Sequence, residues 1–238
     1  MKLEKIVDWL DRTLNVQAFD DVSNNGLQID RDGGEIKSVA FAVDASVRAV
    51  EAAIAAGADL LVVHHGISWG GGIRRLAGGV GTVVRTAIRG NLALYACHLP
   101  LDAHPKLGNN AQLAESLKLK SLKPAFSYHG NVIGFVGEAT REQEFETREG
   151  KLLVPKGARV GVCSGGAGEF AEEAKNLGCD VFVTGEANWG EVIAAENCAM
   201  PMVCGGHYET EVYGVRAVAA KLRRELKVKT LDLTEELK

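Results

Sequence analysis

The feature that most constrains the fold is a block of sequence that occurs twice. Residues 53–66 and 174–187 each contain the end of a helix, a glycine, an aspartate and an apolar strand, in that order. Gly178 lies 121 positions after Gly57, and an aspartate follows two positions later in both copies. Apolar runs that alternate with helical segments of about ten residues are typical of β-α-β units. The sequence therefore predicts two similar α/β lobes related by an internal repeat.

The expected elements follow the same alternation in both halves. In the first half we expect strands at 39–43, 60–63 and 92–96 and helices at 2–14, 46–56, 80–89 and 111–117. In the second half we expect strands at 131–137, 160–163, 181–183 and 202–204 and helices at 169–177, 189–196 and 212–226. Entirely apolar strands fit a parallel sheet that is covered on both faces. We place the boundary near Ser127, so that residues 1–127 form the first lobe and residues 128–238 the second.

Charge and hydropathy exclude several classes of protein. The 238 residues include 27 Lys and Arg and 31 Asp and Glu, for a net charge of −4. An acidic chain argues against nucleic-acid binding, which needs a basic face. No apolar run reaches the roughly 20 residues that a membrane helix requires, and the first residues lack the apolar core of a signal peptide. We therefore expect a cytoplasmic protein with neither a membrane nor a nucleic acid as partner.

The five cysteines do not form a recognisable framework. Their number is odd, their spacings are wide, and no C-x-x-C occurs. This pattern argues against structural disulfides and against a zinc site built on cysteine. Cys97 and Cys204 fall within expected strands, so we expect reduced, structural cysteines.

Four of the six histidines lie where expected strands end. In open α/β sheets, ligands bind at the carboxyl ends of the strands. A single histidine at such a place is more often structural, but four at equivalent places indicate a shared site. They are His64 and His65 after the second strand, His98 after the third, and His207 in the second half. A carboxylate follows four residues after each of the last two, Asp102 after His98 and Glu211 after His207.

These residue types suit a metal site. Adjacent residues at the end of a strand point to opposite sides, so His64 and His65 can reach different ligands. Imidazole and carboxylate together bind zinc, iron or manganese, and two ions about 3.5–4 Å apart need a bridging carboxylate. The sequence therefore predicts two divalent metal ions per chain, of unidentified metal, with the ligands His64, His65, Asp102, His207 and Glu211.

The same motifs resemble those of the NIF-three-like family of dinuclear metal-centre proteins, also called GTP cyclohydrolase I type 2 homologues. The family's blocks occur here in order as Asn24-Asn25-Gly26-Leu27, Leu60–His65, His98–Ala103, Thr184-Gly185-Glu186 and Gly206–Glu211. The resemblance implies the same five metal ligands, placed in the cleft between two α/β lobes, and assembly into a homohexamer. It also implies that His98 and Glu186 line this cleft, where we expect them to transfer protons or to support the metal ligands.

Three segments depart from the family pattern. Gly66-Ile67-Ser68-Trp69 stands where relatives have proline and a bulky apolar residue, and Ser23 stands where they have an aspartate. Residues 104–110 replace a glycine-rich segment. These departures leave the metal ligands intact and concern the substrate pocket.

Two classes of function remain open. The first is a metal-dependent hydrolase of cyclohydrolase or phosphoesterase type that acts on a nucleotide or phosphoester. Four arginines could then hold a triphosphate, namely Arg74, Arg75, Arg85 and Arg89. For Arg85 and Arg89, a solvated helix face is the better explanation. The second is a non-enzymatic metal-binding scaffold or regulatory interaction protein. The sequence does not identify the metal or the substrate.

Overall fold

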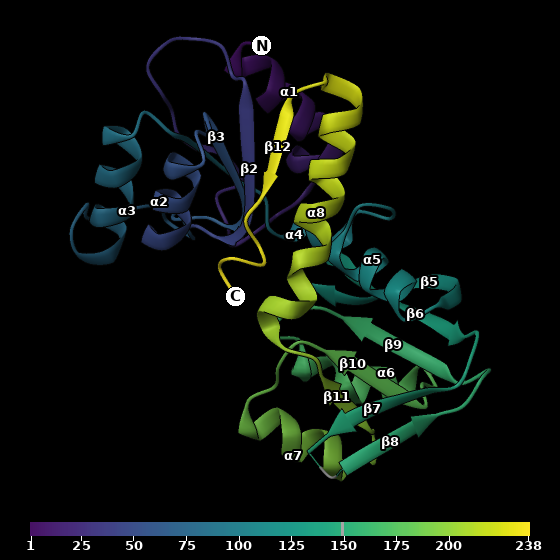
Figure 1. The fold of residues 1–238 in the computed structure, drawn as a ribbon. Coiled ribbons are helices and arrows are strands. Elements are labelled where there is room, and N and C mark those ends of the chain that lie inside the picture. The colour runs from purple at the N-terminus through teal and green to yellow at the C-terminus, as the bar shows by residue number, and fades with distance from the viewer. Residues whose placement is uncertain (149) are drawn as a thin grey trace. The chain divides into compact units, whose positions relative to one another are not determined.

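A computed structural model describes residues 1–148 and 150–238 and separates them into two compact units (Figure 1). Unit 1 comprises residues 1–101 and 215–238, and unit 2 comprises residues 102–214. Each unit contains a five-stranded sheet accompanied by helices. The predicted α/β class with two lobes is therefore confirmed.

The division of the chain differs from the predicted boundary at residues 127 and 128. Strand β12 (Lys229–Asp232) pairs in parallel with β2 (Ser38–Asp44), so the end of the chain completes the sheet of unit 1. Strand β5 (Leu119–Tyr128) pairs with β6 (Asn131–Ala139), so residues after position 101 already belong to unit 2. The extent of unit 1 is determined by backbone pairing between segments that are distant in sequence, such as β2 and β12. Such pairing cannot be predicted from composition.

The sheet of unit 1 has the strand order β1-β4-β3-β2-β12. Strands β4 (Ala93–Ala96), β3 (Leu60–His65), β2 and β12 are parallel, and β1 (Gly26–Ile29) pairs antiparallel with β4 at the edge. Helices α2 (Val47–Ala55) and α3 (Gly78–Arg89) pack with this sheet in one apolar core. Ser46 begins α2 by accepting a hydrogen bond from the Ala49 amide.

Helix α1 (Leu3–Leu14) and the 3-10 turn Val16–Ala18 also belong to unit 1. The helix buries Ile6, Leu10 and Leu14, which the four-residue spacing places on one face. Helix α4 (Leu99–Ala103) and helix α8 (His207–Leu226) each contain one of the two points where the chain passes between the units.

The sheet of unit 2 has the strand order β11-β10-β9-β6-β5. Strands β9 (Arg159–Cys163), β10 (Val181–Thr184) and β11 (Met202–Cys204) are parallel, whereas β6 pairs antiparallel with β9. The remaining elements are α5 (Asn109–Ser116), the 3-10 turn Gly168–Phe170, α6 (Ala171–Asn176), α7 (Trp189–Asn197) and the hairpin of β7 (Gln143–Thr147) and β8 (Gly150–Val154).

The repeated block adopts the same local structure in both units. Gly57 and Gly178 have φ angles of 72° and 74°, and each amide bonds to the carbonyl three residues before it. The aspartate that follows caps the neighbouring strand in both units, because Asp59 Oδ2 accepts the Lys37 amide and Asp180 Oδ2 accepts the Arg159 amide, each at 2.7 Å. The two copies are thus equivalent in backbone and in hydrogen bonding.

The cysteines are free thiols, and Cys97 and Cys204 lie where strands end. The five cysteines form no disulfide among the described residues. Cys97 is buried directly after β4 rather than inside a strand, and Cys204 ends β11 with its side chain exposed. Among the helices of residues 1–148 and 150–238, none combines the length and the apolarity needed to cross a membrane.

The shared glycine position leads to a stability prediction. Gly57→Ala and Gly178→Ala should each lower the free energy of unfolding by roughly 1 kcal/mol, because alanine is strained at positive φ although nothing lies within 4 Å of either new Cβ. Gly71→Ala is the matched control, since its Cβ is equally unobstructed and its φ is not positive. Chemical denaturation followed by circular dichroism measures all three, and equal stability of Gly178→Ala and Gly71→Ala would contradict the prediction.

Candidate metal centre

Three histidines of unit 1 form a cluster at the carboxyl edge of its sheet. His64 and His65 end β3, and His98 follows β4, which is its parallel neighbour. Each ring offers one nitrogen such that these ligand atoms all lie within 4.8 Å of one another. The ring centroids are 4.5 Å apart for His64 and His65 and 5.1 Å apart for His64 and His98. The parallel register therefore brings the predicted histidines together.

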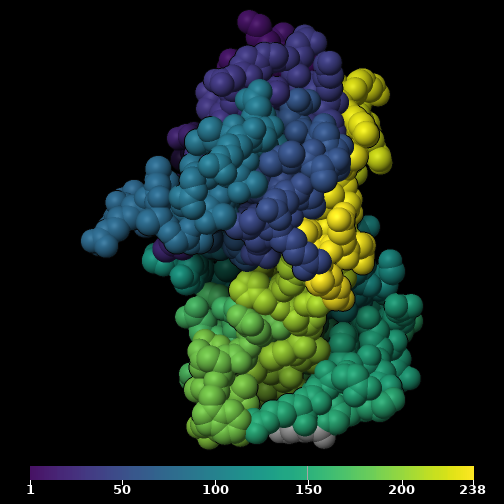
Figure 2. Space-filling model, turned by 60° about the vertical axis from the view of Figure 1, so that its left-hand side comes forward, coloured from purple at the N-terminus to yellow at the C-terminus, as the bar shows by residue number. Residues whose placement is uncertain are grey.

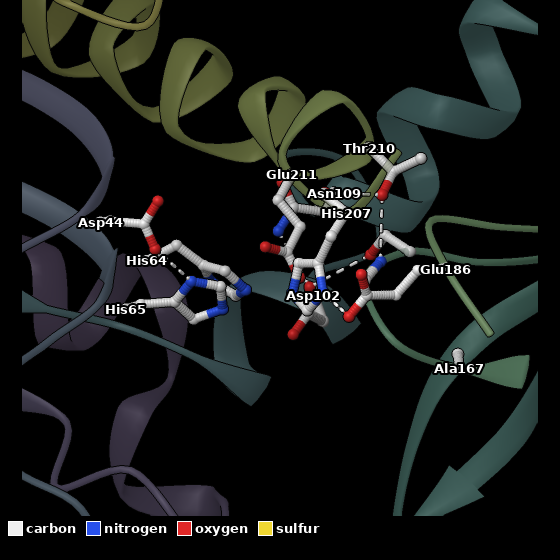
Figure 3. Close-up of polar contacts among 12 residues, drawn as sticks. Asp44, His64, His65, Asp102, Asn109, Ala167, Glu186, His207, Thr210 and Glu211 are labelled. Carbon is white, nitrogen blue, oxygen red and sulfur yellow. Dashed lines mark hydrogen bonds and ion pairs between the residues drawn. The ribbon is translucent and has the colours of Figure 1, made fainter. Parts of the chain in front are cut away.

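An oxygen atom holds the Nδ1 atom of each of these rings. The Nδ1 of His64 lies 3.0 Å from the Cys97 carbonyl oxygen. The Nδ1 of His65 lies 2.9 Å from Asp44 Oδ1, as Figure 3 shows, and the Nδ1 of His98 lies 2.9 Å from Asp21 Oδ1. Carbonyl and carboxylate oxygens accept, so each Nδ1 carries the proton. In a neutral ring this tautomer places the lone pair on Nε2, the arrangement typical of histidines that bind metals.

The carboxylate that holds His98 comes from Asp21, two residues before Ser23, which stands where relatives have an aspartate. Asp21 Oδ2 accepts hydrogen bonds from the Asn25 amide group and the Leu99 amide, each at 2.8 Å. Burial raises the pKa of Asp21, but its hydrogen bond and ion pair with His98 and its other donors outweigh burial and lower the pKa to about 2. The side chain is therefore a charged, fixed partner of His98.

A second cluster lies in unit 2 and contains Asp102, Glu186, His207 and Glu211 (Figure 3). The Nε2 of His207 lies 3.2 Å from Glu211 Oε1, one helical turn further along α8. Asp102 and Glu211 also offer ligand oxygens within 4.8 Å of each other. Glu186 Oε1 lies 2.9 Å from His207 Nδ1, so a carboxylate holds this ring as Asp44 holds His65.

Neighbouring side chains fix the carboxylate of Asp102. Its Oδ1 accepts hydrogen bonds from Asn109 Nδ2 at 2.9 Å and from Ser164 Oγ at 3.3 Å. Asn109 is itself held, because its Oδ1 accepts the Gly214 amide at 2.7 Å. Asp102, Asn109 and Ser164 are all buried. This arrangement gives Asp102 one orientation before any ligand binds.

Gly165 lies directly against Glu211. A Cβ atom at Gly165 would come within 2.4 Å of Glu211 Oε1, and the φ angle of 69° is also unfavourable for other residues. The Gly165 amide donates to Thr210 Oγ1 at 3.0 Å, which ties this loop to the first turn of α8. Glycine is therefore required here for the carboxylate to occupy its position.

The pKa of His207 is raised to about 9. The largest cause is the hydrogen bond to Glu211. Burial lowers the pKa, whereas the hydrogen bond to Glu186 and the charges of both carboxylates raise it further. In the metal-free protein the ring is therefore protonated at pH 7. Because a metal binds the neutral ring, ligation would release this proton.

The structure brings every predicted site residue into one of the two clusters. Unit 1 holds His64, His65 and His98, and unit 2 holds Asp102, Glu186, His207 and Glu211. The donors are imidazoles and carboxylates, a set that fits zinc, iron or manganese. The clusters could therefore bind metal.

Sequence reasoning missed several residues that hold the predicted ligands, namely Asp21, Asp44, Asn109 and Ser164. A signal existed for Asp44, because it directly follows the strand at 39–43 and so shares the carboxyl edge with His65. Asn109 lay within a segment that we assigned to the substrate pocket, and nothing near Ser164 marked it. The four arginines considered for a triphosphate are Arg74, Arg75, Arg85 and Arg89, and all are exposed.

Comparison with known proteins identifies the family. The sequence pattern of Duf34/NIF3 (NGG1p interacting factor 3) matches residues 1–236. A protein of Deinococcus radiodurans named GTP cyclohydrolase 1 type 2 homolog is 43% identical over 236 residues, covering 93% of this chain and 89% of the relative. One of the same name from Pyrococcus horikoshii is 37% identical over 252 residues and covers 97% of each chain. The chain belongs to the Duf34/NIF3 family, as its motifs predicted.

Solved structures share the fold over nearly the whole chain. Protein ybgI, described as having unknown function, superposes with a TM-score of 0.86 at 28% identity and covers 98% of both chains. Reduced HcgD from Methanocaldococcus jannaschii superposes with a TM-score of 0.81 at 25% identity, again over 98% of both chains.

The charge of Asp21 predicts a pH-dependent stability. Its folded pKa of about 2 lies below the usual 3.8, so its contribution is complete above about pH 4 and is lost as the pH falls towards 2. Asp21→Asn should therefore be less stable than wild type at pH 6, and the difference should shrink as the pH falls to 3. Denaturant titrations at each pH measure the difference, with the exposed Asp8→Asn as control. A difference that stays constant with pH would refute the assignment.

The His207 cluster predicts a titration that NMR can follow. In metal-free protein the ring nitrogens of His207 should titrate near pH 9. Glu186→Gln should lower this pKa, because it removes one of the two carboxylates that stabilise the protonated ring. The amide can still accept a hydrogen bond, so a change reports charge rather than lost geometry. An unchanged pKa in Glu186→Gln would show that Glu186 does not act on the ring.

Proposed function

We propose that this chain binds two divalent metal ions and acts as a metal-dependent hydrolase. The observation that carries the proposal is that four histidine rings share the same pattern of hydrogen bonding at Nδ1. Each holds its Nδ1 within 3.0 Å of an oxygen acceptor, which favours Nε2 as a ligand nitrogen. The proposed ligands are His64, His65, Asp102, His207 and Glu211.

The family resemblance leads us to propose that both clusters contribute ligands to the metal centre. Asp102 follows His98 by four residues, and four residues of chain span at most about 14 Å. The cluster of unit 1 alone is chemically incomplete for two ions, because it has no carboxylate among the proposed ligands. The cluster of unit 2 has two carboxylates, Asp102 and Glu211, which would hold divalent ions and offset their charge.

Two bound divalent ions would supply an acidified water as nucleophile and would polarise the bond to be cleaved. The protein's own groups have separate tasks. Asp44 keeps the His65 ring in the tautomer whose Nε2 can bind a metal. The hydrogen bond from Asn109 orients the Asp102 carboxylate before a metal binds. Glu186 has a side chain that is 63% exposed, so it can exchange protons with solvent, and we assign it the proton transfer that accompanies hydrolysis.

His98 is the second candidate for proton transfer. Asp21 fixes its Nδ1, and its ring lies 5.1 Å from that of His64. A charged carboxylate behind an imidazole stabilises the protonated ring that forms when Nε2 takes up a proton. The pairing therefore suits His98 to accept a proton at Nε2.

The proposed substrate is a nucleotide or phosphoester. The relatives' name, GTP cyclohydrolase 1 type 2 homolog, makes GTP the first compound to test. The same metal chemistry would also act on a phosphorus centre. The family resemblance further leads us to propose assembly as a homohexamer.

Metal content tests the ligand assignment. Protein prepared without chelators or a histidine tag should contain about two metal ions per chain by elemental mass spectrometry. Asp102→Asn and His207→Ala should lose most of this metal, because each removes a ligand. His129→Asn is the matched control, since it removes a histidine outside both clusters and asparagine tolerates its φ of 48°. Wild-type protein that takes up no zinc, iron or manganese would refute the site.

Turnover tests the hydrolase assignment separately. The metal-loaded protein should hydrolyse GTP or a model phosphoester, and Glu186→Gln should lower kcat while it keeps its metal. Two bound ions without turnover across nucleotides and phosphoesters would reject the hydrolase and leave a non-enzymatic metal-binding protein. Circular dichroism melting of each variant separates lost activity from lost folding.

A further inference from the structure

An open cavity lies at the amino edge of the unit 1 sheet. Its volume is about 820 Å³, and its lining residues come from three segments, 1–5, 35–37 and 226–228. The second and third segments lead directly into the parallel neighbours β2 and β12, whereas the histidines of unit 1 lie where β3 and β4 end. Figure 1 and Figure 2 both show the first residues and the end of α8 at the same end of unit 1. The cavity is therefore separate from the histidine cluster.

Four lysines determine the charge of this cavity, which we call the lysine cavity. Among the described residues that line it, Glu35 alone is acidic, so four lysines and one glutamate give a net charge of +3, although the whole chain carries −4. The Oε2 of Glu35 lies 3.6 Å from the amino group of Met1. A concave surface lined by one sign of charge attracts ions of the opposite sign. The lysines are Lys2, Lys5, Lys37 and Lys227.

These four ammonium groups have no protein partner in the part of the chain that the structure describes. No ion pair or side-chain hydrogen bond joins them to another residue within 1–148 and 150–238. Other lysines of the chain are paired, since Lys120, Lys151 and Lys221 each lie beside a glutamate. Like charges gathered around one cavity repel one another, and a bound anion would offset this repulsion. The lysine cavity is therefore complementary to an anion.

The backbone around the lysine cavity is fixed before any ligand binds. The Ile36 amide donates to the Met1 carbonyl at 2.7 Å, and the amino group of Met1 donates to the Ile36 carbonyl at 3.1 Å. The Lys37 amide donates to Asp59 Oδ2 at 2.7 Å. Ile36 and Val228 are buried and so anchor their segments. The lysines therefore extend from an ordered support, which lowers the entropy lost on binding.

We propose that the lysine cavity binds a small, soluble molecule that carries several phosphate groups. A lining charge of +3 complements a ligand with three or more negative charges, which a single phosphate group does not have at neutral pH. Each lysine is a point charge with three donors on a flexible stem, so the four can adjust to phosphates at different positions. The volume of the cavity falls within the roughly 300–1,000 Å³ that is usual for small-molecule sites.

Neither a long polyanion nor the metal centre explains the lysine cavity. Nucleic acids need an extended basic face, and this chain has a net charge of −4. The histidines of unit 1 lie at the opposite edge of the sheet, so a phosphate ligand in the cavity requires neither a metal ion nor hydrolysis. The cavity is therefore a second binding site with its own ligand.

Isothermal titration calorimetry with inorganic tripolyphosphate tests the proposal. Wild-type protein should bind one tripolyphosphate per chain, and added salt should weaken the binding because it screens exposed charges. Orthophosphate should bind at least about tenfold more weakly, because it offers fewer charges to the lysines. Tripolyphosphate should also raise the melting temperature of the protein, since it binds the folded chain.

Substitutions of single lysines locate the binding. Lys5→Gln, Lys37→Gln and Lys227→Asn should each raise the dissociation constant about threefold, and the triple variant should raise it about thirtyfold. Asparagine is used at position 227 because the φ of Lys227 is 57° and Asn15 has a similar φ of 52° at the end of α1. Lys156→Gln is the matched control, since Lys156 is exposed and lies outside the cavity, and it should bind like wild type. Melting curves without ligand should show that all variants are folded, because each substituted side chain is exposed.

Three results would overturn the proposal. One is wild-type protein that binds no tripolyphosphate. Another is an equal dissociation constant for the triple variant and Lys156→Gln, which would place the anion elsewhere. The third is binding that disappears in Asp102→Asn, which would assign the phosphates to the metal centre. Tripolyphosphate that still binds to metal-depleted Asp102→Asn would support the lysine cavity independently of the metal centre.

Discussion

The parallel arrangement of strands is the constraint on which the rest of the structure depends. Parallel strands end at one edge of their sheet, so residues that follow different strands become neighbours. In unit 1 the edge gathers His65 with Asp44, in register on adjacent strands, and adds His98 from the next strand. In unit 2 the same logic places Glu186 beside His207. The chemistry of both clusters follows from this geometry.

The two units use the repeated block in opposite ways. Glu186 occupies the position that corresponds to His65, 121 residues earlier. In unit 1 the strand end provides the imidazole and a neighbouring strand provides the carboxylate. In unit 2 the strand end provides the carboxylate, and α8 provides the imidazole. The histidine–carboxylate pair is therefore retained while its two partners have exchanged places.

The sequence predicted the parallel strands well because each is a continuous apolar run. It did not reveal β12, since Lys229–Asp232 is short, contains a single apolar residue and lies at the edge of the sheet. It also did not reveal β5, whose exposed side chains include lysines. The pairing of β12 with β2 depends on a contact across almost the whole chain, and local sequence contains no information about it.

In the candidate site, too, the sequence predicts some residues and not others. The ligand types and their places at strand ends could be read from residues such as His64 and Asp102. The residues that hold them could not, because their roles depend on loops. Asp21 lies five residues before β1 and reaches His98 only through the folding of that loop. Asn109 is fully buried, and its amide joins two elements that only the tertiary structure brings together.

The discontinuous composition of unit 1 has a consequence for synthesis on the ribosome. Residues 102–214 of unit 2 are contiguous, so all its strands have emerged before the last strand of unit 1 is made. Unit 1 must keep the edge of β2 unpaired until β12 arrives. An exposed strand edge is a template for wrong pairing between chains. During synthesis there is therefore an interval in which unit 2 is complete and can fold, while unit 1, although it was begun first, still lacks β12.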